Sequence, residues 1–143
     1  MLQYFFYIAG RYNLIPEREM KYELEYTLNC SPKVLFARLS TPEGLSEWFA
    51  DNVHVDGDIF TFLWGKSESK ARLAALKENK FVRFEWLDIG TEESNFFEFR
   101  INVTELSGSV ALIITDFADE EEKDDAIYLW DTQISDLKRA LGI

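Results

Sequence analysis

The 143-residue chain has little with which to build a metal centre, a disulfide or a nucleophilic active site. Cys30 is its only cysteine and His54 its only histidine. No internal disulfide can therefore form, and no thiolate cluster can hold a metal. We expect no cofactor and no metal site, and a reducing, cytoplasmic location fits the cysteine count. Because His54 alternates with Val53 and Val55, we expect it on a solvent-facing side of a short strand.

Positive charge is also scarce. Fifteen lysines and arginines stand against 26 aspartates and glutamates, a formal net charge of −11. Such a chain repels a phosphate backbone and an anionic lipid surface, so we expect neither nucleic-acid binding nor docking on an anionic lipid surface. The acidic run from Asp119 to Asp125 lacks the glycine and the alternating oxygen ligands of a calcium loop. It is better explained as the solvated start of a helix.

A hydrophobic run long enough to span a bilayer is absent too. The apolar run from Leu2 to Ala9 is too short for a membrane helix, and no basic residue precedes it as in a signal peptide. Met20 opens directly onto a strand pattern. We therefore expect translation to begin at Met20, so that residues 1–19 are an N-terminal extension upstream of that start and residues 20–143 form one domain. The alternative is that residues 1–19 form a genuine strand or helix that packs on the domain or a partner.

The segment from Ser31 to Phe49 carries two consecutive helix starts, Ser31-Pro32 and Thr41-Pro42. A serine or threonine at the N-cap accepts a hydrogen bond from a free backbone N–H, and proline at the first helical position loses nothing. The segment ends on the aromatic pair Trp48-Phe49. We expect two short helices here, set between strands.

Apolar and polar residues alternate along seven segments, which is typical of half-buried strands. These segments are 22–28, 53–55, 59–64, 70–77, 81–87, 96–103 and 110–115. The fourth is the weakest, because its alanines and leucines leave a helix open, but the short connections on both sides favour a strand. If 81–87 and 96–103 pair antiparallel, Arg83 and Glu85 can form cross-strand charge pairs with Glu98 and Arg100 on a wet face.

The C-terminal segment has the strongest helical pattern. Its apolar residues recur at spacings of three and four along one face, at Ile127, Trp130, Ile134, Leu137 and Leu141. The whole order predicts an α+β fold. We expect a curved antiparallel sheet of about six to seven strands whose apolar face is covered by this long helix, with two short helices after the first strand.

This order and four motifs resemble the START / birch-pollen-allergen-like (helix-grip, SRPBCC) superfamily, and within it the activator-of-heat-shock-ATPase homologue (Aha-type) group. The second short helix is similar to the family's T-P-E-x-L-x-x-W-F pattern. Three further motifs follow in order, with one glycine of the first lost: Gly57-Asp58-Ile59-Phe60, Phe81–Trp86, and Trp130 with Ile134 and Leu137. The resemblance spans residues 21–143, so residues 20–143 are expected to be a START-like domain.

The resemblance implies a cavity between the sheet and the C-terminal helix, gated by the short helices. Members bind lipids, hormones or polyketides, some act on small molecules, and others are co-chaperone modules. Our candidate ligand-binding residues are those that face this space: Leu45, Trp48, Phe49, Phe60, Phe62, Trp64, Phe84, Trp86, Phe97, Phe99, Leu112, Ile114, Asp116, Trp130 and Ile134. The alternative is that the aromatic side chains simply fill a solid core.

Asp116 follows Leu112 and Ile114 at the two-residue spacing of a strand, so we expect it to point inward, as they do, near the cavity mouth. A buried carboxylate needs a partner, for which Arg72 or Tyr128 are candidates, and it could anchor a ligand or act as a general base. An exposed strand end or a helix cap is the simpler alternative.

Three hypotheses of function follow. The first is binding of a small hydrophobic or aromatic ligand in the cavity. The second is a protein-interaction or co-chaperone-like module, with a homodimer as its mildest form. The third is a cyclase or hydrolase on a hydrophobic substrate, with Asp116 as base. No catalytic motif is present in the sequence, so an enzyme would rest on family analogy alone.

Overall fold

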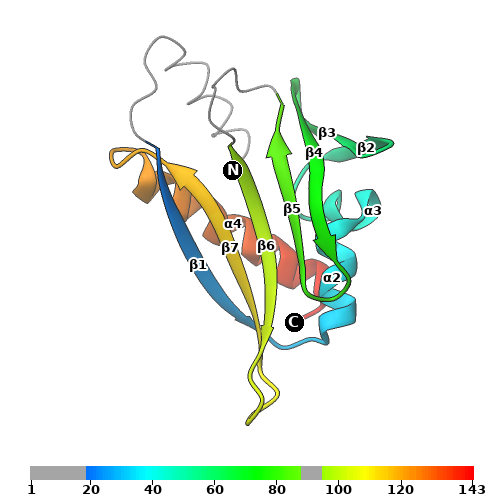
Figure 1. The fold of residues 1–143 in the computed structure, drawn as a ribbon, viewed down its shortest axis with the longest axis vertical. Helices are drawn as coiled ribbons and strands as arrows, with labels where there is room; N and C mark the ends of the chain where they lie inside the picture. Colours follow the sequence, from blue (N-terminus) through cyan, green and yellow to red (C-terminus); the bar gives the residue numbers. More distant parts are fainter. Residues whose placement is uncertain (1–18, 88–94) are drawn as a thin grey trace.

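The computed structural model describes residues 19–87 and 95–143, and Figure 1 shows its elements. The expected extension, residues 1–19, lies outside the described residues except for Glu19. The elements are β1 (Met20–Leu28), α2 (Pro32–Ser40), α3 (Pro42–Leu45), β2 (Asn52–Asp56), β3 (Ile59–Trp64), β4 (Ser67–Lys77), β5 (Phe81–Trp86), β6 (Phe96–Val103), β7 (Val110–Ala118) and α4 (Lys123–Leu141).

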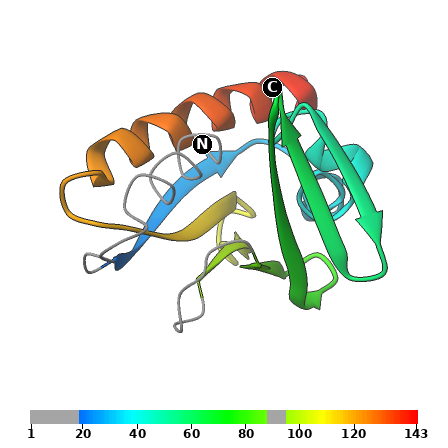
Figure 2. The same cartoon turned by 90° about the horizontal axis from the view of Figure 1, so that it is seen from above.

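The strands form one antiparallel sheet in the order β1-β7-β6-β5-β4-β3-β2. The sheet curves, and α4 runs along its concave side (Figure 2). The predicted α+β fold is confirmed, including the two short helices after the first strand. Residues 70–77 lie within strand β4, so the helical alternative for that segment was wrong.

The first and last strands are neighbours in this sheet. β1 pairs with β7 from Met20 opposite Ala118 to Leu28 opposite Val110, so the two ends of the domain close on each other. From β2 to β7, each strand pairs with the next strand in the chain, and short connections join them. In the described ranges, no helix combines the length and the apolar character needed to cross a membrane.

The two short helices begin as their sequence predicts. The Ser31 hydroxyl oxygen accepts a hydrogen bond from the Val34 N–H at 3.2 Å, and the Thr41 hydroxyl oxygen accepts one from the Gly44 N–H at 2.9 Å. Thr41 also donates to the Ala37 carbonyl oxygen at 2.7 Å. The hydroxyl of Thr41 therefore joins the end of α2 to the start of α3, and fixes the bend between them.

Gly44 lies where the two short helices touch. A Cβ atom at this position would stand 2.1 Å from the Ala37 carbonyl oxygen and 2.6 Å from the Arg38 Cα. Both atoms belong to the backbone of α2, so neither can turn aside as a side chain could. The close contact of α3 with α2 therefore requires glycine.

We predict that Gly44→Ala lowers the free energy of unfolding by about 2 kcal/mol or more, because the added methyl group forces the two helices apart. Glu43→Ala is the matched control, since Glu43 is exposed on the same helix, and it should cost no more than about 0.5 kcal/mol. Urea unfolding followed by tryptophan fluorescence measures both. Equal stability of the two variants would contradict the close contact.

Candidate functional site

The chain that leaves α3 carries three side chains into the space between the sheet and α4. Leu45, Trp48 and Phe49 are all buried. Backbone and side-chain hydrogen bonds hold them there. The Phe49 N–H donates to the Leu45 carbonyl oxygen at 2.9 Å, and the Trp48 indole N–H donates to the Arg38 carbonyl oxygen at 2.8 Å.

The backbone carbonyl oxygen of Phe49 connects the segment that follows α3 with both the sheet and α4. It accepts one hydrogen bond from the Trp64 indole N–H of β3 at 2.8 Å and another from the Gln133 amide of α4 at 3.1 Å. Both donors are buried. Since a buried carbonyl without partners is costly, these two bonds fix the position of Phe49 against both the sheet and the helix.

The Phe49 ring lies at the centre of an aromatic cluster. Six other rings have their centroids between 5.1 and 6.0 Å from it: Trp48, Phe62, Trp64, Phe97, Phe99 and Trp130. Phe60, Phe84 and Trp86 join the cluster through Phe62. The space directly beneath Trp48 and Trp130 is thus occupied by the Phe49 ring, as the alternative of a filled core expects.

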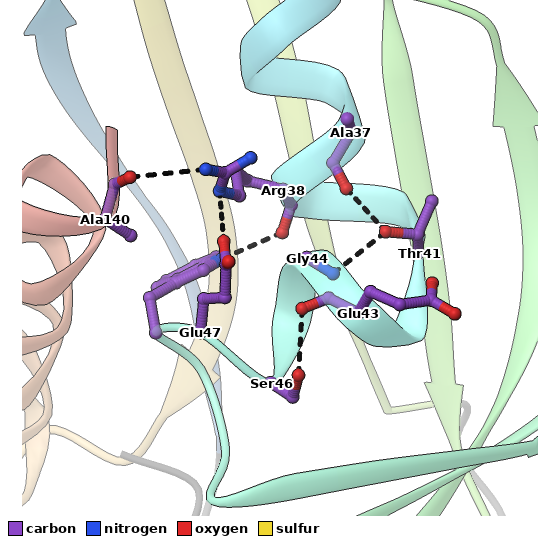
Figure 3. A network of polar contacts seen from close by, with 9 residues as sticks. Ala37, Arg38, Thr41, Glu43, Gly44, Ser46, Glu47 and Ala140 are labelled. Carbon is purple, nitrogen blue, oxygen red and sulfur yellow. Dashed lines mark hydrogen bonds and ion pairs between the residues drawn. The ribbon is translucent and has the colours of Figure 1, made fainter. Parts of the chain in front are cut away.

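Arg38 fastens the two short helices to the far end of α4 (Figure 3). Its guanidinium group donates to the Ala140 carbonyl oxygen at 3.2 Å and forms an ion pair with Glu47. Beside this contact lies an open cleft of about 350 Å³, lined by residues 46–51 between α3 and β2, by Trp64 at the end of β3 and by α4. Its polar lining residues include Ser46, Glu47, Asp51, Gln133 and Asp136.

Asp116 lies at the other end of the space between sheet and helix, and it points inward as predicted. The residue is 6 % exposed. Its Oδ2 accepts hydrogen bonds from the Trp130 indole N–H at 2.9 Å and from the Tyr22 hydroxyl at 3.3 Å. Its Oδ1 accepts one from the Phe117 backbone N–H at 2.8 Å. The carboxyl group therefore connects β1, β7 and α4.

Both partners that the sequence predicted for Asp116 are wrong. Arg72 forms an ion pair with Glu85 at 3.0 Å on the opposite face of the sheet, and Tyr128 is 70 % exposed on the outside of α4. The true partner from the sheet, Tyr22, stands directly opposite Asp116 in the pairing of β1 with β7. The alternation of apolar and polar residues in its strand indicated that Tyr22 faces the core, but nothing local in the sequence showed which strand lies beside β7.

Burial raises the pKa of Asp116 from its ordinary value of 3.8 to about 7. The hydrogen bonds from Trp130, Phe117 and Tyr22 favour the charged form and offset only part of this effect. Burial also raises the pKa of the Tyr22 phenol, and the nearby Asp116 charge adds to that shift. At neutral pH, Asp116 is therefore present in both its protonated and its charged form, so it can donate as well as accept a hydrogen bond.

Half-buried apolar side chains lie along edge strand β1 and on the first turns of α4, near the buried Asp116. Leu24 and Tyr26 on the inner face of β1, and Ala126 and Ile127 on the first turns of α4, remain half-buried although they pack against the core. The Tyr26 hydroxyl bridges the layers by donating to Asp131 at 2.6 Å. These residues are not among the sequence candidates, because half-burial depends on the position of β1 at the sheet edge and of α4 above it, for which there is no local signal.

The remaining sequence candidates are buried on the inner face of the sheet and on α4. Leu112, Ile114 and Ile134 are at most 2 % exposed. His54 is exposed, as expected. Among the described residues, no group of three or more histidine, cysteine, aspartate or glutamate side chains could hold a metal ion.

Comparison with known proteins identifies the architecture. A family model for a START-like superfamily domain matches residues 17–143. The solution structure of BfR322 from Bacteroides fragilis is 40% identical, with a TM-score of 0.64 over 89% of this chain and 94% of that one. The Aha1 dimer from Colwellia psychrerythraea is 17% identical, with a TM-score of 0.74 over 87% of this chain and 97% of that one.

MLL2253 from Mesorhizobium loti has a TM-score of 0.68 at 16% identity, over 86% of this chain and 97% of that one. At such identities, the last two similarities speak for the fold alone. No match was found among curated proteins. The superfamily predicted from the sequence is confirmed.

The raised pKa of Asp116 makes a prediction about stability. Between about pH 4 and pH 7 the folded protein holds a proton that the unfolded chain has released, so the free energy of unfolding falls as the pH rises. The slope is at most about 1.4 kcal/mol per pH unit. Asp116→Asn removes this titration, so the wild type should lose stability relative to the variant between about pH 5 and pH 7, and no further above about pH 8.

Urea unfolding of both proteins across this pH range measures the difference. Asp56→Asn, a change at an exposed carboxyl group of β2, serves as the control; it retains Asp116, so it should lose stability relative to Asp116→Asn as the wild type does. A wild type that gains stability relative to Asp116→Asn as the pH rises would contradict the account of Asp116.

Proposed function

The chain belongs to the START-like superfamily, and we propose that it binds a small, largely apolar molecule between the sheet and α4. Proteins of this superfamily commonly bind hydrophobic ligands. In this proposal the ligand lies between the inner face of β1 and β7 and the first half of α4. Its one polar group faces Asp116.

The observation that carries the proposal is the carboxyl group of Asp116 in an otherwise apolar layer. Its raised pKa means that burial costs the folded state free energy whenever the group is charged. A leucine at the same place would remove that cost. An inward carboxyl with a strongly shifted pKa is therefore a candidate for function rather than for stability.

The half-buried apolar residues near Asp116 support the same position for the ligand. Leu24 pairs with Ile114, so both lie on the inner face beside Tyr22 and Asp116. Leu24 and Ile127 are both half-buried while Ile114 is fully covered. A ligand that covers these side chains gains the free energy of removing apolar surface from water. The cluster around Phe49 then forms the inner end wall of the site.

The charge of the site favours an uncharged amphiphile. Asp116 at a pKa of about 7 accepts and donates hydrogen bonds, which suits a hydroxyl, phenol or amide group. A ligand with a free carboxylate would be repelled by the charged form of Asp116 and by a protein of net charge −11. Fatty acid anions are thus poorer candidates than sterol-like or aromatic alcohols.

A bulky substitution at Leu24 tests this position. Titration with 1-aminoanthracene, a fluorescent aromatic amine, should give saturable binding to the wild type. Leu24→Trp should weaken binding at least about tenfold, which corresponds to about 1.4 kcal/mol, because the indole fills the space between β1 and α4. The probe's own emission is measured, so the added tryptophan does not interfere.

Val55→Trp is the matched control, because Val55 lies exposed on strand β2 at the opposite edge of the sheet. It should bind the probe as the wild type does. Circular dichroism checks that both variants are folded. If Leu24→Trp is folded and binds the probe with unchanged affinity, the ligand does not lie beside Leu24 and the proposal fails.

A further inference from the structure

The convex face of the sheet, opposite α4, carries an unusual group of side chains on strands β4, β5 and β6. In the strand register Arg83 lies opposite Glu98, Phe81 opposite Arg100 and Glu85 opposite both Phe96 and Arg72. Lys77 lies opposite Phe81. We call this group the arginine–phenylalanine patch; its members are Arg72, Lys77, Phe81, Arg83, Glu85, Phe96, Glu98 and Arg100.

One buried carboxylate organises the patch. The side chain of Glu98 is only 8% exposed, and its Oε1 accepts a hydrogen bond from Nε of Arg83 at 3.0 Å and forms an ion pair with Nη2 of the same residue at 3.0 Å. Its Oε2 accepts one from Nε of Arg100 at 3.4 Å. The expected cross-strand pairing of Arg83 with Glu98 is confirmed, but Glu98 is covered rather than wet. Two guanidinium groups thus share a single negative charge.

Aromatic rings hold the same two guanidinium groups from a second side. The Arg83 guanidinium carbon lies 4.1 Å from the centroid of the Phe96 ring, and that of Arg100 lies 4.6 Å from the centroid of Phe81. The Phe117 ring packs edge-on against Phe96 at 5.0 Å. Cation–π contact and a shared carboxylate fix each guanidinium group before any partner arrives, so little side-chain entropy is lost on binding.

The patch is positively charged in a strongly negative protein. Its four cationic side chains, Arg72, Lys77, Arg83 and Arg100, stand against two carboxylates, Glu85 and Glu98, which leaves a local charge of +2. The whole chain carries −11. The side chains of Arg83 and Arg100 remain 41% and 47% exposed. Their outer N–H groups are therefore open to a ligand that approaches the convex face.

From this geometry we propose that the arginine–phenylalanine patch docks an acidic segment of a partner protein that also carries apolar side chains. Arginine and aromatic side chains that are held rigid are the usual centres of binding energy in protein interfaces. Carboxylates of the partner would neutralise the positive charge that Glu98 leaves unbalanced on Arg83 and Arg100, and apolar side chains of the partner would cover Phe81 and Phe96. A nucleic acid is disfavoured as the partner, because its regularly spaced phosphates would extend beyond the patch over the negatively charged rest of the chain, whereas a short acidic segment can be confined to the patch.

This interaction surface is separate from the proposed ligand site, since the two lie on opposite faces of the sheet. Neither proposal depends on the other. Because the attraction is electrostatic, it should weaken as the salt concentration rises, and its effect should be greatest on the rate of association.

The test follows the backbone N–H and the arginine Nε–H signals of ¹⁵N-labelled protein by NMR. The probe is a peptide of alternating glutamate and leucine, compared with a peptide that has glutamine in place of glutamate and with a short oligothymidylate. We expect the acidic peptide to shift the Nε–H signals of Arg83 and Arg100. The glutamine peptide should bind at least about tenfold more weakly, since it lacks the charged partner.

Arg100→Gln should weaken binding of the acidic peptide at least about fivefold. Arg139→Gln is the matched control, because Arg139 is an arginine paired with a single carboxylate, Asp136, on α4, and its loss changes the net charge equally. It should change the affinity by less than about twofold. Arg100→Lys keeps the charge but loses the planar contact with Phe81, so it should bind with intermediate affinity.

Four results would overturn the proposal. The acidic peptide could leave the Arg83 and Arg100 signals unmoved, or Arg139→Gln could weaken binding as much as Arg100→Gln does. The oligothymidylate could bind as tightly as the peptide, which would indicate a nucleic-acid surface. Light scattering could show self-association that Arg100→Gln abolishes, which would make a second copy of the chain the occupant. The dispersion of the NMR spectrum shows whether each variant is folded.

Discussion

The pairing of the first strand with the last determines where the functional groups of this fold lie. β1 and β7 are joined along their whole length, from Met20 opposite Ala118 to Leu28 opposite Val110. The pairing sets Tyr22 opposite Asp116, and α4 follows β7 directly and brings Trp130 to the same carboxyl group. Closing so large a loop costs conformational entropy, which the packing of α4 on both strands must offset.

The two faces of the sheet differ in chemistry as a result. On the concave side, the Phe49 cluster packs one end of the layer solidly, while the other end combines Asp116 with half-buried apolar side chains. On the convex side, buried Glu98 organises two arginines over phenylalanine rings. The proposed ligand lies at the half-buried end, and the packed aromatic end would hold the two layers in place around it. In the convex patch, ion pairs with Glu98 and contacts with phenylalanine rings position both arginines for the docking that we propose.

The sequence predicted those features that depend on neighbouring residues. Ser31-Pro32 and Thr41-Pro42 start helices because their capping bonds are local, and α4 follows from a stripe of apolar residues at helical spacing. The alternation of Phe60, Phe62 and Trp64 correctly assigned them to the buried face. The inward direction of Asp116 followed from the same parity.

What the sequence could not supply depends on contacts between distant segments. The partners of Asp116 were predicted wrongly because they are set by the β1–β7 pairing and by the angle at which α4 crosses it. The sequence left open whether Phe49 roofs a cavity or fills the core, since that depends on how seven rings pack in three dimensions. The half-burial of Leu24 and Ile127 has no local signal either, because it depends on which strand forms the edge of the sheet and on where α4 lies across it.

Native mass spectrometry of the protein purified from cells tests the central claim most directly. If a small apolar molecule occupies the space beside Asp116, the intact protein should carry a non-covalent adduct that denaturing solvent releases. The released molecule should be an uncharged amphiphile with a single polar group. A protein that appears only at its bare mass, and that also takes up no such amphiphile when mixed with a set of sterol-like and aromatic alcohols, would contradict the account.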